Sequence, residues 1–171
     1  DVAAGRYQGG LYRMPFRSAM GMLYYRTDLL DQIGAEPPET FSDLVSASET
    51  VQETTDVPYG YVWQGLQYEG LVTNFVEIIA GFGGFWVNPD TLEVGLDSEA
   101  GIQAVEFMRN AINQGITPAG VTNYLEEDSL RVFENGNAVF LRNWPYVWAE
   151  ANKDESPVQG KIALKPMVHA P

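Results

Sequence analysis

The stretch AVFLRNWPY at residues 138–146 decides the fold of this chain of 171 residues. Its first four residues are apolar, and a short apolar run of this kind is typical of a buried strand. Pro145 fits the first turn of a helix, where the N–H that proline lacks would have no partner in any case. The sequence therefore predicts a buried strand at 138–141 and a helix at 144–152.

Predicted strands and helices alternate on both sides of this stretch. Short apolar runs bounded by turn residues predict further strands at 11–16, 20–25, 59–63 and 161–164. Apolar residues at helical spacing predict helices at 27–33, 40–54, 69–80, 98–114 and 125–135. Interleaving of this kind implies an α/β layered fold.

Two of the predicted helices have clear end signals. Thr40 is a good N-cap residue, and Asp43 three positions later completes a capping box. A second helix begins after Asp97 or Ser98 and is closed by Gly115. Its apolar positions are expected to form one buried stripe, made of Ala100, Ile102, Ala104, Val105, Met108, Ala111 and Ile112.

Composition argues against several classes of protein. Ten Lys and Arg residues against 23 Asp and Glu residues give a formal net charge of -13, which is unsuited to nucleic acid or an anionic membrane. There is no Cys and a single His, so disulfides and thiolate metal sites are excluded, and we expect no metal or cofactor. No apolar run approaches the roughly 20 residues of a membrane span, so we expect no membrane insertion of this segment.

Trp144 and Tyr146 are the first candidates for a binding site. They follow a buried strand and flank a proline, at the type of strand end where ligands bind in α/β proteins. A flat aromatic ring suits the apolar C–H face of a sugar, and nearby polar groups suit its hydroxyls. The alternative is ordinary core packing of two aromatic residues, and composition leaves both interpretations open.

The loop at 63–70 is a second candidate. It holds Trp63, Gln64, Gln67, Tyr68 and Glu69 around glycines, which is more hydrogen-bonding capacity than a connecting loop needs. The alternative is a surface loop in which Glu69 only favours the start of a helix.

Two charged segments give weaker signals. Phe16 and Arg17 lie between the first two predicted strands, where the guanidinium offers donors to ligand hydroxyls or a carboxylate, or is simply solvated. Residues 126–128, EED, favour the first turn of a helix much more than acid–base or metal chemistry.

Taken in order, the segments of this chain resemble the carbohydrate-type extracellular solute-binding proteins of ABC importers, the family that includes maltose- and trehalose/maltose-binding proteins. The matching segments are GLYRMP at 10–15, LYYRTDLL at 23–30, PPETFSDL at 37–44, QYEGL at 67–71, FGG at 82–84, FENGNA at 133–138 and NWPY at 143–146. Each segment is common by itself, but their shared order and spacing cover nearly the whole chain.

The resemblance implies one lobe of a type II periplasmic-binding-protein fold, with a small central sheet flanked by helices. Residues 1–171 would form a single lobe, the C-terminal one, without the first lobe and the final helical segment. The resemblance also implies that the whole two-lobe protein binds a sugar or another small polar ligand in the cleft between its lobes and delivers it to the permease subunits in the membrane. The expected location is periplasmic or extracellular, with a lipid anchor on a missing N-terminal segment as one option.

In the trehalose/maltose-like members of the family, the aromatics at the positions of Trp144 and Tyr146 touch the sugar. The resemblance also places Tyr68 and Glu69 near positions that make polar contacts with the ligand in the family. Where the family has a ligand-binding Tyr and Asp, this chain has Arg17 and Ala19. A glycoside hydrolase fragment is the alternative. It would need two carboxyl groups about 5 to 10 Å apart across the scissile bond, and no carboxylate lies close to Trp144 in the sequence.

Overall fold

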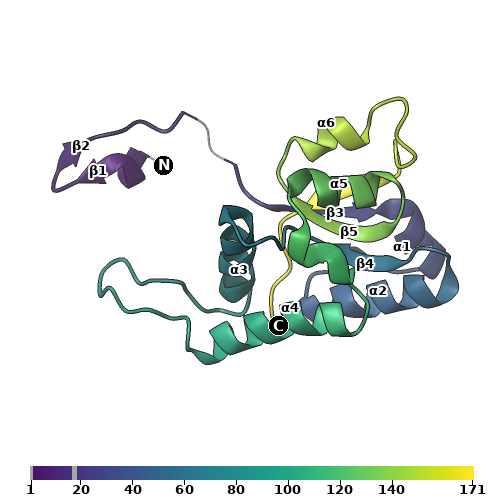
Figure 1. Cartoon of the computed structure of the whole chain (residues 1–171), viewed down its shortest axis with the longest axis horizontal. Helices are drawn as coiled ribbons and strands as arrows, with labels where there is room; N and C mark the ends of the chain where they lie inside the picture. Colours follow the sequence, from purple (N-terminus) through teal and green to yellow (C-terminus); the bar gives the residue numbers. More distant parts are fainter. Residues whose placement is uncertain (1, 17–18) are drawn as a thin grey trace.

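A four-stranded mixed sheet is packed among helices on the right-hand side of Figure 1. The computed structural model describes residues 2–16 and 19–171. The strand order is β4-β5-β3-β6. Strand β5 pairs in parallel with β4 and antiparallel with β3, and β3 pairs antiparallel with β6. The bounds are β3 Met22–Arg26, β4 Tyr59–Val62, β5 Ala138–Asn143 and β6 Ile162–Lys165.

Strand β5 is an inner strand, and this explains its apolar sequence. All six of its residues are buried, because β4 and β3 flank it and helices cover both of its faces. The prediction of a buried strand after residue 137 is therefore confirmed, and the strand runs two residues further than expected, through Arg142 and Asn143. The strands predicted at 20–25, 59–63 and 161–164 are confirmed to within two residues at each end.

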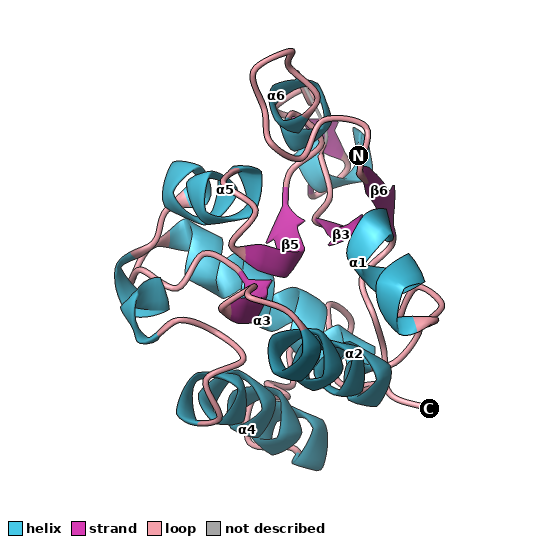
Figure 2. Cartoon of the chain, turned by 90° about the vertical axis from the view of Figure 1, so that its right-hand side faces the viewer, coloured by secondary structure: helices cyan, strands magenta, loops and turns pink. Residues whose placement is uncertain are grey.

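Helices cover both faces of the sheet (Figure 2). Successive residues of a strand point to opposite faces, and in β3 Leu23 and Tyr24 belong to different apolar clusters. The first cluster lies against α1 Thr27–Ile33, α2 Phe41–Thr54, α3 Glu69–Gly81 and α4 Glu99–Asn113. The second lies against α5 Glu126–Glu134 and α6 Val147–Ala151. The predicted α/β class, a small sheet flanked by helices, is confirmed.

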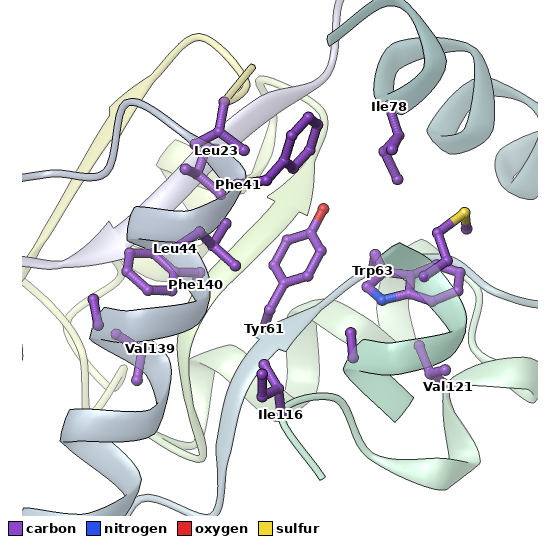
Figure 3. Packing of buried hydrophobic residues seen from close by; sticks show 14 of the residues in the cluster. Leu23, Phe41, Leu44, Tyr61, Trp63, Ile78, Ile116, Val121, Val139 and Phe140 are labelled. Carbon is purple, nitrogen blue, oxygen red and sulfur yellow. The ribbon is translucent and has the colours of Figure 1, made fainter. Parts of the chain in front are cut away.

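Tyr61 on β4 lies in the middle of the first cluster (Figure 3). Phe41 and Leu44 of α2, Ile78 of α3 and Ile116 surround it in the same cluster. These residues come from four separate segments, so the cluster fixes the helices of one layer to the sheet.

Within residues 2–16 and 19–171, no helix is both long enough and apolar enough to cross a membrane.

The predicted helix ends are confirmed in detail at α2. Thr40 Oγ1 accepts a hydrogen bond from the Asp43 amide at 3.1 Å, and Asp43 Oδ2 accepts one from the Thr40 amide at 2.9 Å. Ser98 caps α4 by accepting a hydrogen bond from the Gly101 amide at 3.2 Å. Gly115 follows α4 with a φ of 74°, a conformation that costs glycine little.

Three predicted elements are wrong or too long. Residues 11–16 are not a strand of the main sheet, because only β2 Gly10–Leu11 pairs, with β1 Arg6–Tyr7, in a small hairpin after the short 3₁₀ helix η1 Val2–Gly5. Helix α6 begins three residues later than predicted, after a turn at Pro145 and Tyr146. The stripe predicted on α4 is narrower than expected, because Ile102 and Val105 are about half exposed.

Candidate functional site

The ends of two parallel strands place the candidate site. Strands β4 and β5 run in the same direction, so the residues that follow them lie at the same edge of the sheet. Gln64 comes after β4, and Arg142 and Asn143 end β5. All three side chains are buried, and the Gln64 amide nitrogen donates to Ser129 Oγ of α5 at 2.7 Å. The sheet edge and the start of α5 are thereby fixed to each other.

Trp144 is held at this edge by its backbone and by its ring. Its amide donates to Asn143 Oδ1 at 2.8 Å, and its carbonyl accepts a hydrogen bond from the Tyr24 hydroxyl at 3.0 Å. Its indole Nε1 donates to Glu126 Oε1 at 3.2 Å. The residue is only half-buried and belongs to neither apolar cluster. Of the two interpretations left open by composition, simple core packing does not describe Trp144.

Tyr146 stands at the surface two residues later. It is 37% exposed, and its hydroxyl donates to Glu127 Oε1 at 3.2 Å. Burial and the adjacent Glu127 carboxylate raise the pKa of Tyr146. The phenol therefore stays protonated and acts as the donor to Glu127.

Glu126 and Glu127 lie at the candidate site, although the sequence favoured only a role at the start of a helix for them. Both lie in the first turn of α5, as predicted for acidic residues, but their side chains also orient the two aromatic rings. One sequence signal predicts this proximity. The turn at Asn135 and Gly136 reverses the chain between α5 and β5. The end of the strand therefore lies beside the start of the helix.

Glu126 has an unusual electrostatic environment. Burial alone would raise its pKa, but polar contacts with Tyr68, its own backbone and Trp144, together with the Arg142 charge, outweigh burial and lower the pKa. Glu126 is therefore a carboxylate at neutral pH. It offers a negatively charged acceptor at the edge of the Trp144 ring.

Tyr68 is the third aromatic residue of this edge. It is half-buried, and its hydroxyl lies beside the Glu126 carboxylate without a hydrogen-bond partner of good geometry among the described residues. Burial and Glu126 raise the pKa of Tyr68. We call Tyr68, Trp144 and Tyr146 the aromatic wall, because Glu126 contacts two of these residues and Glu127 the third.

The other predicted site residues are not part of the aromatic wall. Gln67 and Glu69 flank Tyr68 and are exposed. Phe16 is fully exposed, and Arg17 lies outside the described residues. Trp63, from the same predicted loop as Tyr68, lies in the first apolar cluster at 4% exposure (Figure 3).

The wall combines flat rings with charged acceptors, and this chemistry suits a ligand with both apolar faces and hydroxyls. Within the described ranges, no group of three or more His, Cys, Asp or Glu residues is arranged to hold a metal ion.

Comparisons with known proteins agree with this fold. A probable ABC transporter-binding protein of Deinococcus radiodurans is 37% identical over 168 residues, which is 95% of this chain and 40% of that protein. A maltotriose-binding protein of Pyrococcus abyssi is 26% identical over 95% of this chain and 32% of that protein. The chain thus spans well under half the length of these relatives.

A solved structure is also similar. The maltose-bound MalE3 of T. maritima superposes with a TM-score of 0.92 and 40% identity, covering 99% of this chain and 44% of that one. The resemblance to type II periplasmic-binding proteins is therefore confirmed for the fold. The family model described as bacterial extracellular solute-binding protein matches residues 1–169. This chain belongs to the family of bacterial extracellular solute-binding proteins.

Proposed function

We propose that the whole protein is the substrate-binding component of an ABC importer, and that this chain binds a sugar or oligosaccharide at the aromatic wall. The observation that carries the proposal is that Glu126 and Glu127 hold the two candidate aromatic residues, Trp144 and Tyr146, at the sheet edge. An isolated surface aromatic needs no such partner. A ring with a fixed edge can receive a ligand at low cost in side-chain entropy.

The wall favours a neutral, hydroxyl-rich ligand. The ring of Trp144 would stack on the C–H face of a sugar, and the second oxygens of Glu126 and Glu127 would accept its hydroxyls. Two carboxylates close to the rings would repel an acidic sugar. This argument favours a neutral ligand over the acidic one that Arg17 suggested from the sequence. The maltose in MalE3 and the maltotriose in the name of the Pyrococcus protein belong to this chemical class.

We further propose that the chain is the C-terminal lobe of a two-lobe protein. It spans 40% of the Deinococcus relative and 44% of MalE3, which is what one lobe of a two-lobe protein would cover. The aromatic wall would then be one side of a cleft. A ligand that contacts both sides favours the closed form by its higher affinity for that form, and the permease subunits in the membrane would engage the closed form.

Gln67, Glu69, Phe16 and Arg17 are proposed as outer contacts. Gln67 and Glu69 are exposed beside Tyr68, so they are free to reach a ligand that rests on the wall.

The whole protein would work on the outer side of the cytoplasmic membrane, in the periplasm or at the cell surface. A lipid anchor is one means of keeping it there.

Calorimetry on the whole protein tests the proposed function. Maltose and maltotriose are the panel, and we expect saturable binding of at least one of these two glucose oligomers. Failure of every member of the panel to bind a folded protein would contradict the proposal.

Incubation with maltotriose, followed by chromatography of the products, tests the glycoside hydrolase alternative. We expect the sugar to be recovered intact.

A further inference from the structure

Arg142 is a fully buried cation next to the aromatic wall. Its side chain is 0% exposed and forms a bidentate pair with Glu77 of α3, in which Nε donates to Oε2 at 2.7 Å and Nη2 to Oε1 at 2.5 Å. The remaining nitrogen, Nη1, donates to Gln64 Oε1 at 3.1 Å. A buried charge is costly unless it is paired and fully hydrogen-bonded. Three hydrogen bonds to two partners fix both the position and the plane of this guanidinium.

The ring of Trp144 rests on that guanidinium. The central carbon of the guanidinium lies 4.1 Å from the centroid of the ring, which is a cation–π contact. Glu126 holds the edge of the same ring through Nε1. One face of Trp144 is thus covered by a fixed cation, so a ligand that stacks on this ring would have to use the opposite face.

The support below Arg142 is itself rigid. Gln64 is buried, and its Oε1 also accepts a hydrogen bond from the amide of buried Asn74 at 3.1 Å. Glu77 Oε1 accepts the Gly21 backbone amide at 3.2 Å, just before β3 begins. A Cβ at Gly21 would clash with the Glu77 carboxylate and with Arg142 Nε. The backbone at Gly21 therefore packs directly on the Arg142–Glu77 ion pair.

We propose that Arg142 and Glu77 are positioning residues that set the plane of the Trp144 ring and so define the face on which the ligand stacks. Neither residue needs to touch the ligand. The effect on sugar affinity rests on the proposed function, whereas the effect on the ring does not depend on any ligand.

Arg26 provides an internal comparison for this proposal. It is 8% exposed and forms a similar bidentate pair with Asp28, with distances of 2.7 and 2.6 Å. Within the described part of the chain, the cation–π contact is made by Arg142 and not by Arg26. A bidentate pair of similar geometry that does not support Trp144 is therefore available as a matched control.

Fluorine NMR of the whole protein, labelled with 5-fluorotryptophan and free of ligand, tests the proposal. The resonance that disappears in Trp144→Phe is assigned to Trp144. Arg142→Lys keeps the charge but loses the planar fork of donors, so we expect the Trp144 resonance to shift and broaden. Arg26→Lys makes the same chemical change at a residue far from Trp144 in the sheet register, and we expect it to leave that resonance in place.

A second variant keeps the proposal testable if Arg142→Lys does not fold. Replacing both members of a buried ion pair by apolar residues of similar size often preserves stability, so Arg142→Met with Glu77→Met should fold. It also removes the cation below the ring, and we expect the same shift and broadening. An unchanged Trp144 resonance in a folded variant would overturn the proposal, as would an equal change in Arg26→Lys.

Sugar affinity is measured separately on the same proteins with maltose and maltotriose. We expect Arg142→Lys to weaken binding about three- to tenfold, and Arg26→Lys to leave it unchanged. If the wild-type protein binds neither sugar but the resonance moves, the positioning role stands and the proposed function fails. If a sugar binds and the resonance stays, the positioning role fails and the proposed function stands.

Discussion

Arg142 and Arg26 lie near opposite ends of the antiparallel pair β3–β5, and each is buried in a bidentate pair with a carboxylate. The partner of Arg26 is Asp28, two residues away in the first turn of α1, whereas the partner of Arg142 is Glu77, 65 residues away on α3. Only Arg142 is followed by an aromatic residue that rests on it. A buried ion pair by itself therefore does not indicate a binding site. The side chains that pack on the pair distinguish a candidate site from a purely structural pair.

The electrostatic setting of the two ends differs as well. At the Arg26 end, burial would raise the pKa of Asp28, but the hydrogen bond and charge of Arg26, the Leu29 amide and the Lys161 charge outweigh burial and lower it. At the Arg142 end, the arginine charge also reaches Glu126, which holds Trp144. Among the described residues, charge, ring and acceptor are therefore connected at the Arg142 end and not at the Arg26 end.

Removal of Glu77 is the strongest test of this comparison. Glu77→Ala leaves a fully buried guanidinium without its carboxylate, so we expect the free energy of unfolding to fall by about 3 kcal/mol. Asp28→Ala should cost only about 1 kcal/mol, because 38% of the Asp28 side chain is exposed and water can replace the pair in part. Chemical denaturation followed by circular dichroism measures both. Equal losses would show that the two ends are equivalent.

Removal of the ring itself should affect binding more than stability. Trp144→Ala in the whole protein should weaken sugar binding by about 1 to 3 kcal/mol, the usual effect of losing an aromatic anchor. Trp86→Ala is the control, since Trp86 packs on Phe75 and is 38% exposed. Calorimetry with maltose and maltotriose measures both variants. Equal affinity of Trp144→Ala and wild type, with an intact fold, would remove Trp144 from the site.

Acid should loosen the Arg142 end through Glu126. Its folded-state pKa is lowered from 4.5, so its contribution is present above that pH and is lost as the pH falls through the lower folded value. The loss should be small, about 0.5 kcal/mol, because Glu126 is only partly buried and solvent weakens its contacts. Denaturation between neutral pH and pH values below 4.5 should show this loss in the wild type and not in Glu126→Gln. Parallel curves for the two proteins would contradict the assignment.

The smallest expected effect concerns the outer part of the aromatic wall. Tyr146→Phe removes the hydroxyl that donates to Glu127 and keeps the ring, so stacking should persist. We expect sugar affinity to fall about twofold, equivalent to roughly 0.5 kcal/mol. Tyr146→Ala, which removes the ring as well, should have the larger effect. An equal effect of the two variants would assign the whole contribution of Tyr146 to its hydroxyl.

The elements with local signals were predicted well from the sequence. Helix α1 and the capping box of Thr40 and Asp43 have their predicted positions, because their hydrogen bonds connect residues within one turn. Strand β5 was evident from its unbroken apolar run. The predictions for Ile102 and Val105 on α4 failed, because periodicity does not tell how wide a stripe the neighbouring layer covers.

The candidate site could be predicted only in part. Trp144 and Tyr146 were selected by their place after β5, and the structure brings Tyr68 near them through Glu126. Trp63 looked equally suited to a site, yet it lies in the core. Trp63 and Tyr68 are only five residues apart in this loop. The path of the chain between them places Trp63 in the core and Tyr68 at the sheet edge beside Glu126.

By itself, the sequence determined the α/β class, most helices and strands, and two aromatic residues at a strand end, because periodicity, caps and turn residues act over a few positions. The tertiary structure decided that Arg142 pairs with Glu77, that Trp144 rests on this pair, and that Glu126 and Glu127 hold the aromatic wall. These contacts connect residues 18 to 65 positions apart, or depend on ones that do. They follow from the strand order β4-β5-β3-β6 and the helices packed on it, which no local pattern contains.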